Sequence, residues 1–145
     1  MARKLRIKAP RSAALTINRG AIEGAQLVYL ALANRRIRYR YGRSYIVYIG
    51  TTKAGASRIA ASAAAKASEM LALRGVYELT FHVVTCRGRK RVKTWKKLER
   101  ALLLTFREMY GEVPRCNKQG RGIRWMDEPT YFSGSRLRDI IERFS

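Results

Sequence analysis

The chain has 145 residues, 47% of them hydrophobic, so it can bury a core and is not a disordered basic tail. Lys and Arg total 31 against 10 Asp and Glu, which gives a formal net charge of +21. A compact body with that charge favours an anionic partner, most commonly the phosphodiester backbone of nucleic acid, with an anionic membrane surface as the rival. No apolar run approaches the roughly 18 residues of a spanning helix. The segment Ala56–Arg74 has few large apolar residues and would bind a lipid surface poorly, so no membrane partner is expected.

The N-terminal residues 1–24 are basic and weakly patterned, with interruptions at Pro10 and Gly20. We expect them to form an arm that contacts nucleic acid. Two cysteines, Cys86 and Cys116, are far apart in no metal-ligand spacing, and His82 has no ligand type beside it. A zinc site is therefore not expected, and the cysteines indicate reduced thiols in a cytoplasmic protein.

Two segments after the arm are rich in β-branched and aromatic residues and predict strands at Gln26–Ala33 and Tyr45–Ile49. Between them, Ile37–Tyr41 alternates apolar and charged residues, which is also typical of a strand. The sequence Gly42-Arg43-Ser44 predicts the turn. This region therefore predicts an antiparallel unit of two or three strands.

A helix is predicted over Ala56–Arg74, which is rich in alanine and contains no proline or glycine. Gly75 ends this helix, and Tyr77–Thr85 predicts the next strand. A densely basic connection, Arg87–Lys97, follows the strand. It leads into the clearest helix pattern, Trp95–Tyr110, in which apolar residues recur at steps of three and four.

Gly111 and Pro114 are suited to end that helix, and a final helix is predicted over Arg136–Phe144 with Ser135 as its cap. The order strand, strand, helix, strand, helix predicts an α+β fold with a small three-stranded antiparallel sheet flanked by helices. The last helix is expected to complete the core, with a dimer face as the alternative, through four apolar residues: Leu137, Ile140, Ile141 and Phe144.

One carboxylate stands out on the Trp95–Tyr110 helix. Glu99 shares a side with Leu102, Leu103 and Phe106, where its charge costs solvation unless a partner offsets the cost. Taken alone, it is explained by a structural ion pair with a neighbouring Lys or Arg. The alternative is an oxygen ligand for Mg²⁺, which often binds only one or two protein carboxylates.

Arg58 is a second candidate, because it stands near the start of a surface of Ala and Ser that lets another molecule approach closely. It is either a solvated surface arginine or a clamp on a phosphate. Tyrosines on the predicted strands, Tyr29, Tyr39 and Tyr48, are usually packing residues. A phenol, with a pKa near ~10, serves as a base only where cations lower that value.

These residues, in this order, resemble the GIY-YIG family of nucleases. Tyr48-Ile49-Gly50 matches the second half of the family signature, and Arg58 follows at a spacing that the family often shows. Glu99 is similar in place to the family's metal-binding glutamate, and Asn117 to its downstream asparagine. The resemblance covers roughly residues 26–120 and divides the chain into the arm 1–24, a nuclease domain 25–120 and a C-terminal extension 121–145.

The first half of the signature is not literal in this chain. Leu27-Val28-Tyr29 is the preferred equivalent, which makes Tyr29 the first tyrosine, and Tyr39 is the competitor. The family often has a histidine four residues after the arginine, where this chain has Ser62, and His82 is expected to be structural. The group that activates water is therefore open.

The resemblance implies hydrolysis of DNA phosphodiester bonds with one Mg²⁺ or Mn²⁺ held by Glu99. Arg58 would bind a non-bridging oxygen, Tyr29 or Tyr48 would accept a proton from water, and Asn117 would orient water or a helix. DNA is the expected substrate, with RNA as an alternative, and monomer and homodimer both stay open.

The basic connection is expected to grip phosphates beside this site, with Trp95 as helix-start packing rather than a stacking group. A non-catalytic nucleic-acid binder of ribosomal or architectural type is the alternative function, since it explains charge and aromatics equally well. The expected nucleic-acid-binding residues are Arg87, Arg89, Lys90, Arg91, Lys93, Lys96, Lys97, Arg121 and Arg124.

Overall fold

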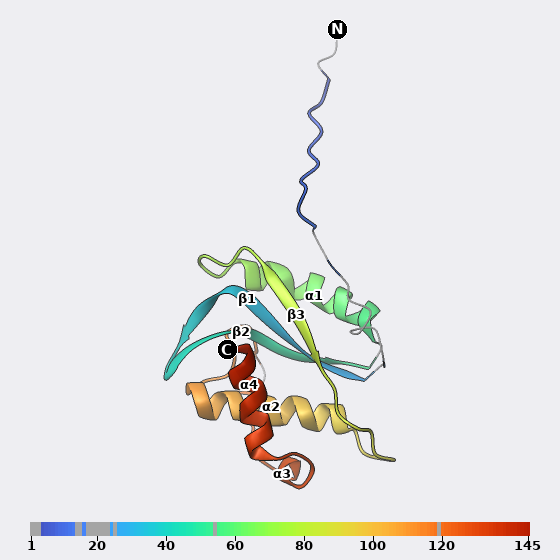
Figure 1. Cartoon of the computed structure of the whole chain (residues 1–145), viewed down its shortest axis with the longest axis vertical. Helices are drawn as coiled ribbons and strands as arrows, with labels where there is room; N and C mark the ends of the chain where they lie inside the picture. The colour runs from blue at the N-terminus through green and yellow to red at the C-terminus, as the bar shows by residue number, and fades with distance from the viewer. Residues whose placement is uncertain (1–3, 14–15, 17–23, 25, 54, 119) are drawn as a thin grey trace.

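The computed structural model describes residues 4–13, 16, 24, 26–53, 55–118 and 120–145, without the side chains of 56–60 and 62–64. Figure 1 shows an α+β fold in which one three-stranded antiparallel sheet is packed between helices. Residues 4–13 form no helix or strand and lead away from the body. The strand order is β2-β1-β3, and the strands are β1 (Leu27–Tyr39), β2 (Gly42–Thr52) and β3 (Leu79–Val84).

The first two strands form one long hairpin, and the predicted turn is two residues away from the real one. Tyr39 pairs with Gly42, so the chain turns at Arg40 and Tyr41 and not at 42–44. The Tyr39 ring is buried and its hydroxyl donates to the Ile46 carbonyl at 2.7 Å. Of the two alternatives that the sequence left open, the structure forms two strands, because the segment up to Tyr39 continues β1.

A bulge in β2 decides which side chains share a face near its end. Ala31 pairs with Tyr48 and Leu32 with Ile46, so Val47 is an extra residue. Val47 and Tyr48 both pack with Ala31 on the side of the sheet that carries α1 (Ala56–Leu71). We call this face the α1 side.

The α1 side is covered by α1 itself, whose Met70 is buried with Ala31 and Val47. This helix ends at Leu71, three residues before the predicted end. A turn follows it, and Gly75 adopts a positive φ of 77° within that turn. A positive φ favours glycine and is not compatible with an α-helix. The helix therefore ends before the position that the alanine-rich sequence predicted.

The opposite face, the α2 side, carries the main core. Here α2 (Thr94–Tyr110) buries Leu98, Leu102 and Phe106 against the sheet, as its sequence pattern predicted. Gly111, the capping residue directly after this helix, has a φ of 80°. A short helix, α3 (Glu128–Tyr131), and α4 (Gly134–Phe144) complete the chain.

The C-terminal helix packs into this core rather than presenting its apolar face to solvent. Leu137 and Ile141 are buried with the α2 residues, which confirms that they complete the core. Its cap is Ser133 and not Ser135 as predicted, because Ser133 Oγ accepts from the Arg136 amide at 3.4 Å. Within the described part of the chain, no helix is long and apolar enough to span a membrane.

Candidate functional site

Tyr29 and Tyr48 meet on the α1 side beside Gly50. Tyr29 pairs with Gly50 across the hairpin, and the ring centroids of the two tyrosines are 5.9 Å apart. A Cβ atom on Gly50 would lie 2.7 Å from atoms of both rings. Real Cβ atoms do not approach that closely, so a residue without a side chain is what allows both rings to reach this place.

Tyr39 lies elsewhere, on the α2 side. Its ring meets Phe106 edge-on at 5.0 Å, and its hydroxyl also accepts from the Arg115 amide at 3.0 Å. Burial raises the pKa of Tyr39 far above its ordinary value, although the Arg115 amide and charge oppose the shift. Of the two alternatives for the first tyrosine, the structure therefore brings only Tyr29 beside Tyr48.

Glu99 projects from α2 toward the end of β2 and is partly buried. Burial raises the pKa of its carboxyl, opposed by a hydrogen bond from the Thr51 side chain and by the charges of Lys96 and Arg100. Among the described residues no cation lies within ion-pair distance of Glu99, and the adjacent Arg100 pairs instead with Glu128 at 2.7 Å. The structural ion pair that would explain this carboxylate is not formed there.

Asn117 holds the backbone of β2 at its outer edge. Its Oδ1 accepts from the Ile49 amide at 2.9 Å, and its Nδ2 donates to the Ile49 carbonyl at 2.8 Å. The neighbouring Cys116 amide donates to the Val47 carbonyl at 2.9 Å. The segment that follows α2 therefore acts as a partial neighbour for an edge strand.

These contacts converge on four consecutive residues, Tyr48 to Thr51. Tyr29 and Gly50 lie on the α1 side, whereas Thr51 pairs with Val28, whose side chain lies in the α2-side core. Directly paired residues share a face, so Glu99 reaches Thr51 from the opposite face to the tyrosines. Asn117 binds Ile49 at the outer edge of β2, within the same four residues.

Two basic residues of α1 follow this stretch along the chain. Arg58 belongs to the helix, but its side chain falls outside the described part of the structure. Lys66 was not predicted; its Nζ lies 5.5 Å from the centroid of the Tyr48 ring and 3.5 Å from Glu69. The available signal was helix periodicity, because Lys66 stands eight residues after Arg58.

A divalent cation would fit the chemistry of Glu99. Among the described residues no three His, Cys, Asp or Glu side chains are grouped as metal ligands. A Mg²⁺ site with one carboxylate and several waters needs no such group. Glu99 supplies a hard oxygen donor whose charge is disfavoured by burial and relieved by a bound cation.

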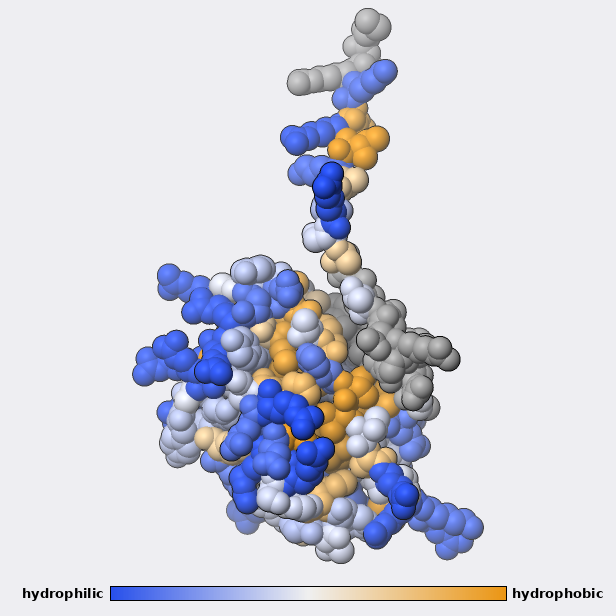
Figure 2. Space-filling view, in the orientation of Figure 1, coloured by the Kyte–Doolittle hydropathy of each residue, from blue (hydrophilic) through white to orange (hydrophobic). Residues whose placement is uncertain are grey.

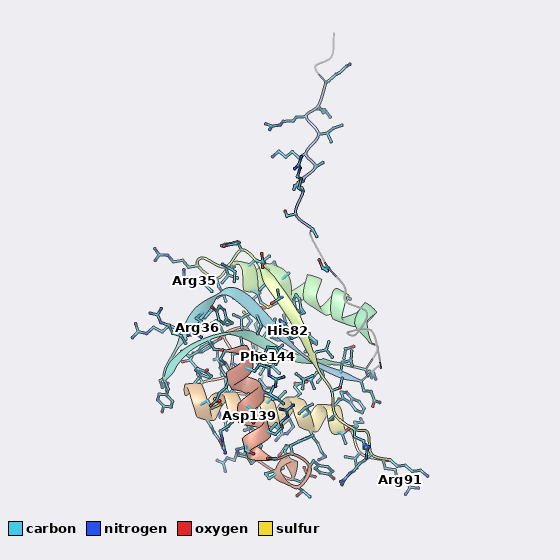
Figure 3. All side chains as sticks on the ribbon, in the orientation of Figure 1. Arg35, Arg36, His82, Arg91, Asp139 and Phe144 are labelled. Atoms are coloured by element: carbon cyan, nitrogen blue, oxygen red, sulfur yellow. The ribbon has the colours of Figure 1, made fainter. Side chains whose placement is uncertain are left out.

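The basic connection forms a tight exposed turn between β3 and α2. Arg89 and Val92 bridge across it, and Arg91, at a φ of 65°, points away from the body (Figure 3). Lys97 differs from the other predicted phosphate contacts, because its Nζ lies 2.6 Å from Asp127. Trp95 packs against the core, as expected. The remaining predicted basic side chains are exposed: Arg87, Arg89, Lys90, Arg91, Lys93, Lys96, Arg121 and Arg124.

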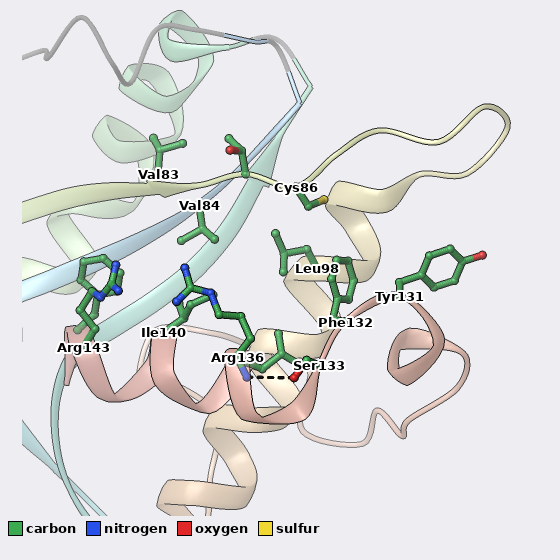
Figure 4. Close-up of a pocket in the computed structure, with 13 residues that line it drawn as sticks. Val83, Val84, Cys86, Leu98, Tyr131, Phe132, Ser133, Arg136, Ile140 and Arg143 are labelled. Atoms are coloured by element: carbon green, nitrogen blue, oxygen red, sulfur yellow. Dashed lines mark hydrogen bonds between the residues drawn. The ribbon is translucent and has the colours of Figure 1, made fainter.

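A groove of about 440 Å³ lies between β3 and α4, and none of the candidate catalytic residues lines it. Its surface includes Val84, Leu98 and Ile140, and Arg136 and Arg143 stand beside them (Figure 4). Figure 2 shows the corresponding apolar patch between β3 and α4. At the far end of α4, Phe144 contacts the ring of His82 at 4.9 Å (Figure 3), which fits the structural role expected of that histidine.

A scan against protein-family models found no matching family, and searches of curated proteins and of solved structures found no significant match. The resemblance to GIY-YIG nucleases therefore rests on the residues of this chain. Tyr29, Tyr48, Glu99 and Asn117 lie around one end of β2, and Arg58 lies on the helix that follows it.

Proposed function

We propose that this chain is a metal-dependent DNA endonuclease of the GIY-YIG type. The observation that carries the proposal is the convergence on Tyr48–Thr51. An aromatic pair, a carboxylate without an ion-pair partner among the described residues and a buried amide all contact this stretch. A purely structural use of these residues does not require a desolvated carboxylate at the same place.

Glu99 is the proposed metal ligand, and the Thr51 hydroxyl fixes the orientation of its carboxylate. A bound Mg²⁺ or Mn²⁺ would supply Lewis-acid polarisation of the scissile phosphate. The carboxylate is partly buried, and the charges of Lys96 and Arg100 act on it without an ion pair among the described residues.

Tyr48 is the proposed proton acceptor, with Tyr29 packed beside it. Lys66 lies over the Tyr48 ring, with its Nζ 5.5 Å from the ring centroid. Arg58 precedes Lys66 by two helical turns on α1, and we assign it the non-bridging phosphate oxygen. Gly50 and Asn117 are positioning residues, because they fix the rings and the backbone of β2 without touching substrate.

The test is cleavage of supercoiled, linear and branched DNA in Mg²⁺ or Mn²⁺ by the wild type and by Glu99→Gln. The glutamine keeps the size of the side chain and an acceptor for Thr51 but removes the charge. The proposal predicts that the wild type cuts and that the variant binds DNA without cutting it. Equal binding by both proteins with no cutting of any substrate would instead support the non-catalytic binder.

A further inference from the structure

A basic hollow extends from the hairpin turn before β2 to Asn117, which binds Ile49 beside the candidate site. It has a volume of about 380 Å³ and includes four arginines and the segment after α2. Arg40 comes from the hairpin turn, Arg107 from the last turns of α2, and Arg115 and Arg121 from the chain beyond it. Elements distant in sequence therefore bring four arginines around one space.

Two of these arginines are held in place by the protein. Arg107 Nη1 donates to the carbonyls of Gly120 at 3.2 Å and Arg121 at 3.1 Å. Arg115 Nη2 donates to the Arg38 carbonyl at 2.7 Å, and its guanidinium lies 5.5 Å from the centroid of the Tyr39 ring. Each arginine has five N–H donors, so these contacts orient the groups and leave other donors for a ligand.

The hollow is poorly neutralised. Glu112 is its one carboxylate among the described lining residues, and it lies 3.6 Å from Arg115. Within the described part of the chain, the guanidinium groups of Arg40 and Arg121 have no carboxylate within ion-pair distance. An anion with several oxygens, such as a phosphate, would complete the hydrogen bonds of these groups.

Asn117 connects this hollow to the candidate site. It lines the hollow and binds Ile49 at the edge of β2. From Gly42 to Tyr48 the strand advances about 20 Å, at roughly 3.3 Å per residue. The same distance corresponds to about six base pairs of duplex DNA, at roughly 3.4 Å along each strand.

We propose that Arg40, Arg107, Arg115 and Arg121 form a binding site for a backbone phosphate of duplex DNA, about six base pairs from the bond that is cut. The phosphate site itself requires only DNA binding, whereas its distance from the cut rests on the proposed nuclease function. The outer edge of β2 is then the path that the DNA follows between the two sites.

The experiment measures DNA affinity against salt concentration for three proteins that all carry Glu99→Gln, which prevents cutting. They are the parent, Arg40→Gln with Arg121→Gln, and a control with Arg136→Gln and Arg143→Gln. Both double variants lose the same charge from exposed arginines, but the control changes lie beside the β3–α4 groove. Thermal unfolding of each protein verifies that it is folded.

The salt slope is the slope of the logarithm of DNA affinity against the logarithm of salt concentration. The proposal predicts that this slope is smaller by about one to two units for Arg40→Gln with Arg121→Gln. Binding should also be roughly tenfold weaker for each DNA phosphate that is no longer bound. The control should retain the parent slope, and Arg40→Lys with Arg121→Lys should restore most of it. Equal reductions of the slope in both double variants would overturn the phosphate site and leave the nuclease proposal untouched.

Cleavage by the same double variants without Glu99→Gln separates the two proposals. A selective decrease of the salt slope without any cutting by the wild type supports the phosphate site and contradicts the nuclease. If cutting occurs, a duplex that ends fewer than about six base pairs from the cut does not reach the phosphate site. The wild type and the double variant Arg40→Gln with Arg121→Gln should therefore cut such a duplex equally well. Absence of DNA binding by the parent would contradict both proposals.

Discussion

Asn117 binds both backbone polar groups of Ile49 with its side-chain amide, at 2.9 and 2.8 Å. The amide thereby replaces the strand that β2 lacks on its outer side. Asn117 is 6% exposed, so water cannot readily take over these bonds if the side chain is removed. The backbone between Tyr48 and Thr51 is therefore fixed by a residue far away in the sequence.

Asn117→Ala should reduce the free energy of unfolding by about 2 to 4 kcal/mol, because it leaves a buried amide and a buried carbonyl of Ile49 unpaired. Urea denaturation measures the loss. Lys118→Ala, at an exposed neighbouring position, is the control and should change stability little. A loss below about 1 kcal/mol would mean that β2 does not depend on this side chain.

Gly50→Ala should displace the rings of Tyr29 and Tyr48, because the new methyl group would overlap both. We expect a loss of about 1 to 3 kcal/mol in stability and a larger relative loss of cleavage. Gly88→Ala is the matched control, since a Cβ there meets nothing within 4 Å. Tyrosine fluorescence, denaturation and cleavage compare the two variants, and equal effects would contradict the role assigned to Gly50.

The raised pKa of Glu99 predicts a pH dependence with a definite sign. Burial makes the folded state hold this proton more tightly than the unfolded chain does. The free energy of unfolding therefore decreases as pH rises through the raised pKa, because the buried carboxyl then becomes charged. Without metal, Glu99→Gln should therefore be at least as stable as the wild type near neutral pH, and the difference should vanish in acid.

Mg²⁺ should reverse this order. At neutral pH it should raise the melting temperature of the wild type and not of Glu99→Gln, because only the carboxylate binds the ion. In acid, where the carboxyl is protonated, the ion should have no effect on either protein. Equal stabilisation of both proteins by Mg²⁺ at neutral pH would show that Glu99 is not the ligand.

The pair of Arg100 and Glu128, in which only the carboxylate is buried, should be the most sensitive ionic contact on α2. Glu128 is 1% exposed and also accepts from the Met126 amide at 2.7 Å. Arg100→Met should cost about 3 to 5 kcal/mol, because it leaves that carboxylate without its cation.

Adding Glu128→Gln to Arg100→Met should recover most of this loss, since the glutamine keeps an acceptor for Met126 and has no charge. Thermal and urea unfolding of the single and double variants form a double-mutant cycle. A double variant as unstable as Arg100→Met alone would show that packing, rather than the unpaired charge, accounts for the cost.

Local sequence patterns were sufficient for most of the fold. The apolar steps of α2, the β-branched strands and the terminating Gly111 act over a few residues, and the α+β sheet followed from them. The turn was misplaced because Gly42 is a strong local signal, whereas the core contact of Tyr39 is made at long range. The capping residue of α4 was missed for a smaller reason, since Ser133 and Ser135 both have the right chemistry.

The candidate site was only partly accessible to sequence reasoning. Residue types and order singled out Glu99 and Tyr48, but the choice between Tyr29 and Tyr39 depends on hairpin register and on the bulge at Val47. No composition rule gives either feature. The contact of Lys66 with Tyr48 likewise depends on how α1 lies across the sheet.

The open side of β3 has a consequence for how the protein behaves at high concentration. Among the described residues β3 pairs only with β1, and its sequence, LTFHVV, contains no Lys, Arg, Asp or Glu. Such an edge can add a strand from another molecule, and the net charge of +21 keeps copies apart. Nucleic acid that neutralises this charge removes the repulsion. Mixtures of the protein with nucleic acid should therefore be least soluble where the two charges balance. A lysine introduced on β3 should prevent this precipitation, which turbidity measures.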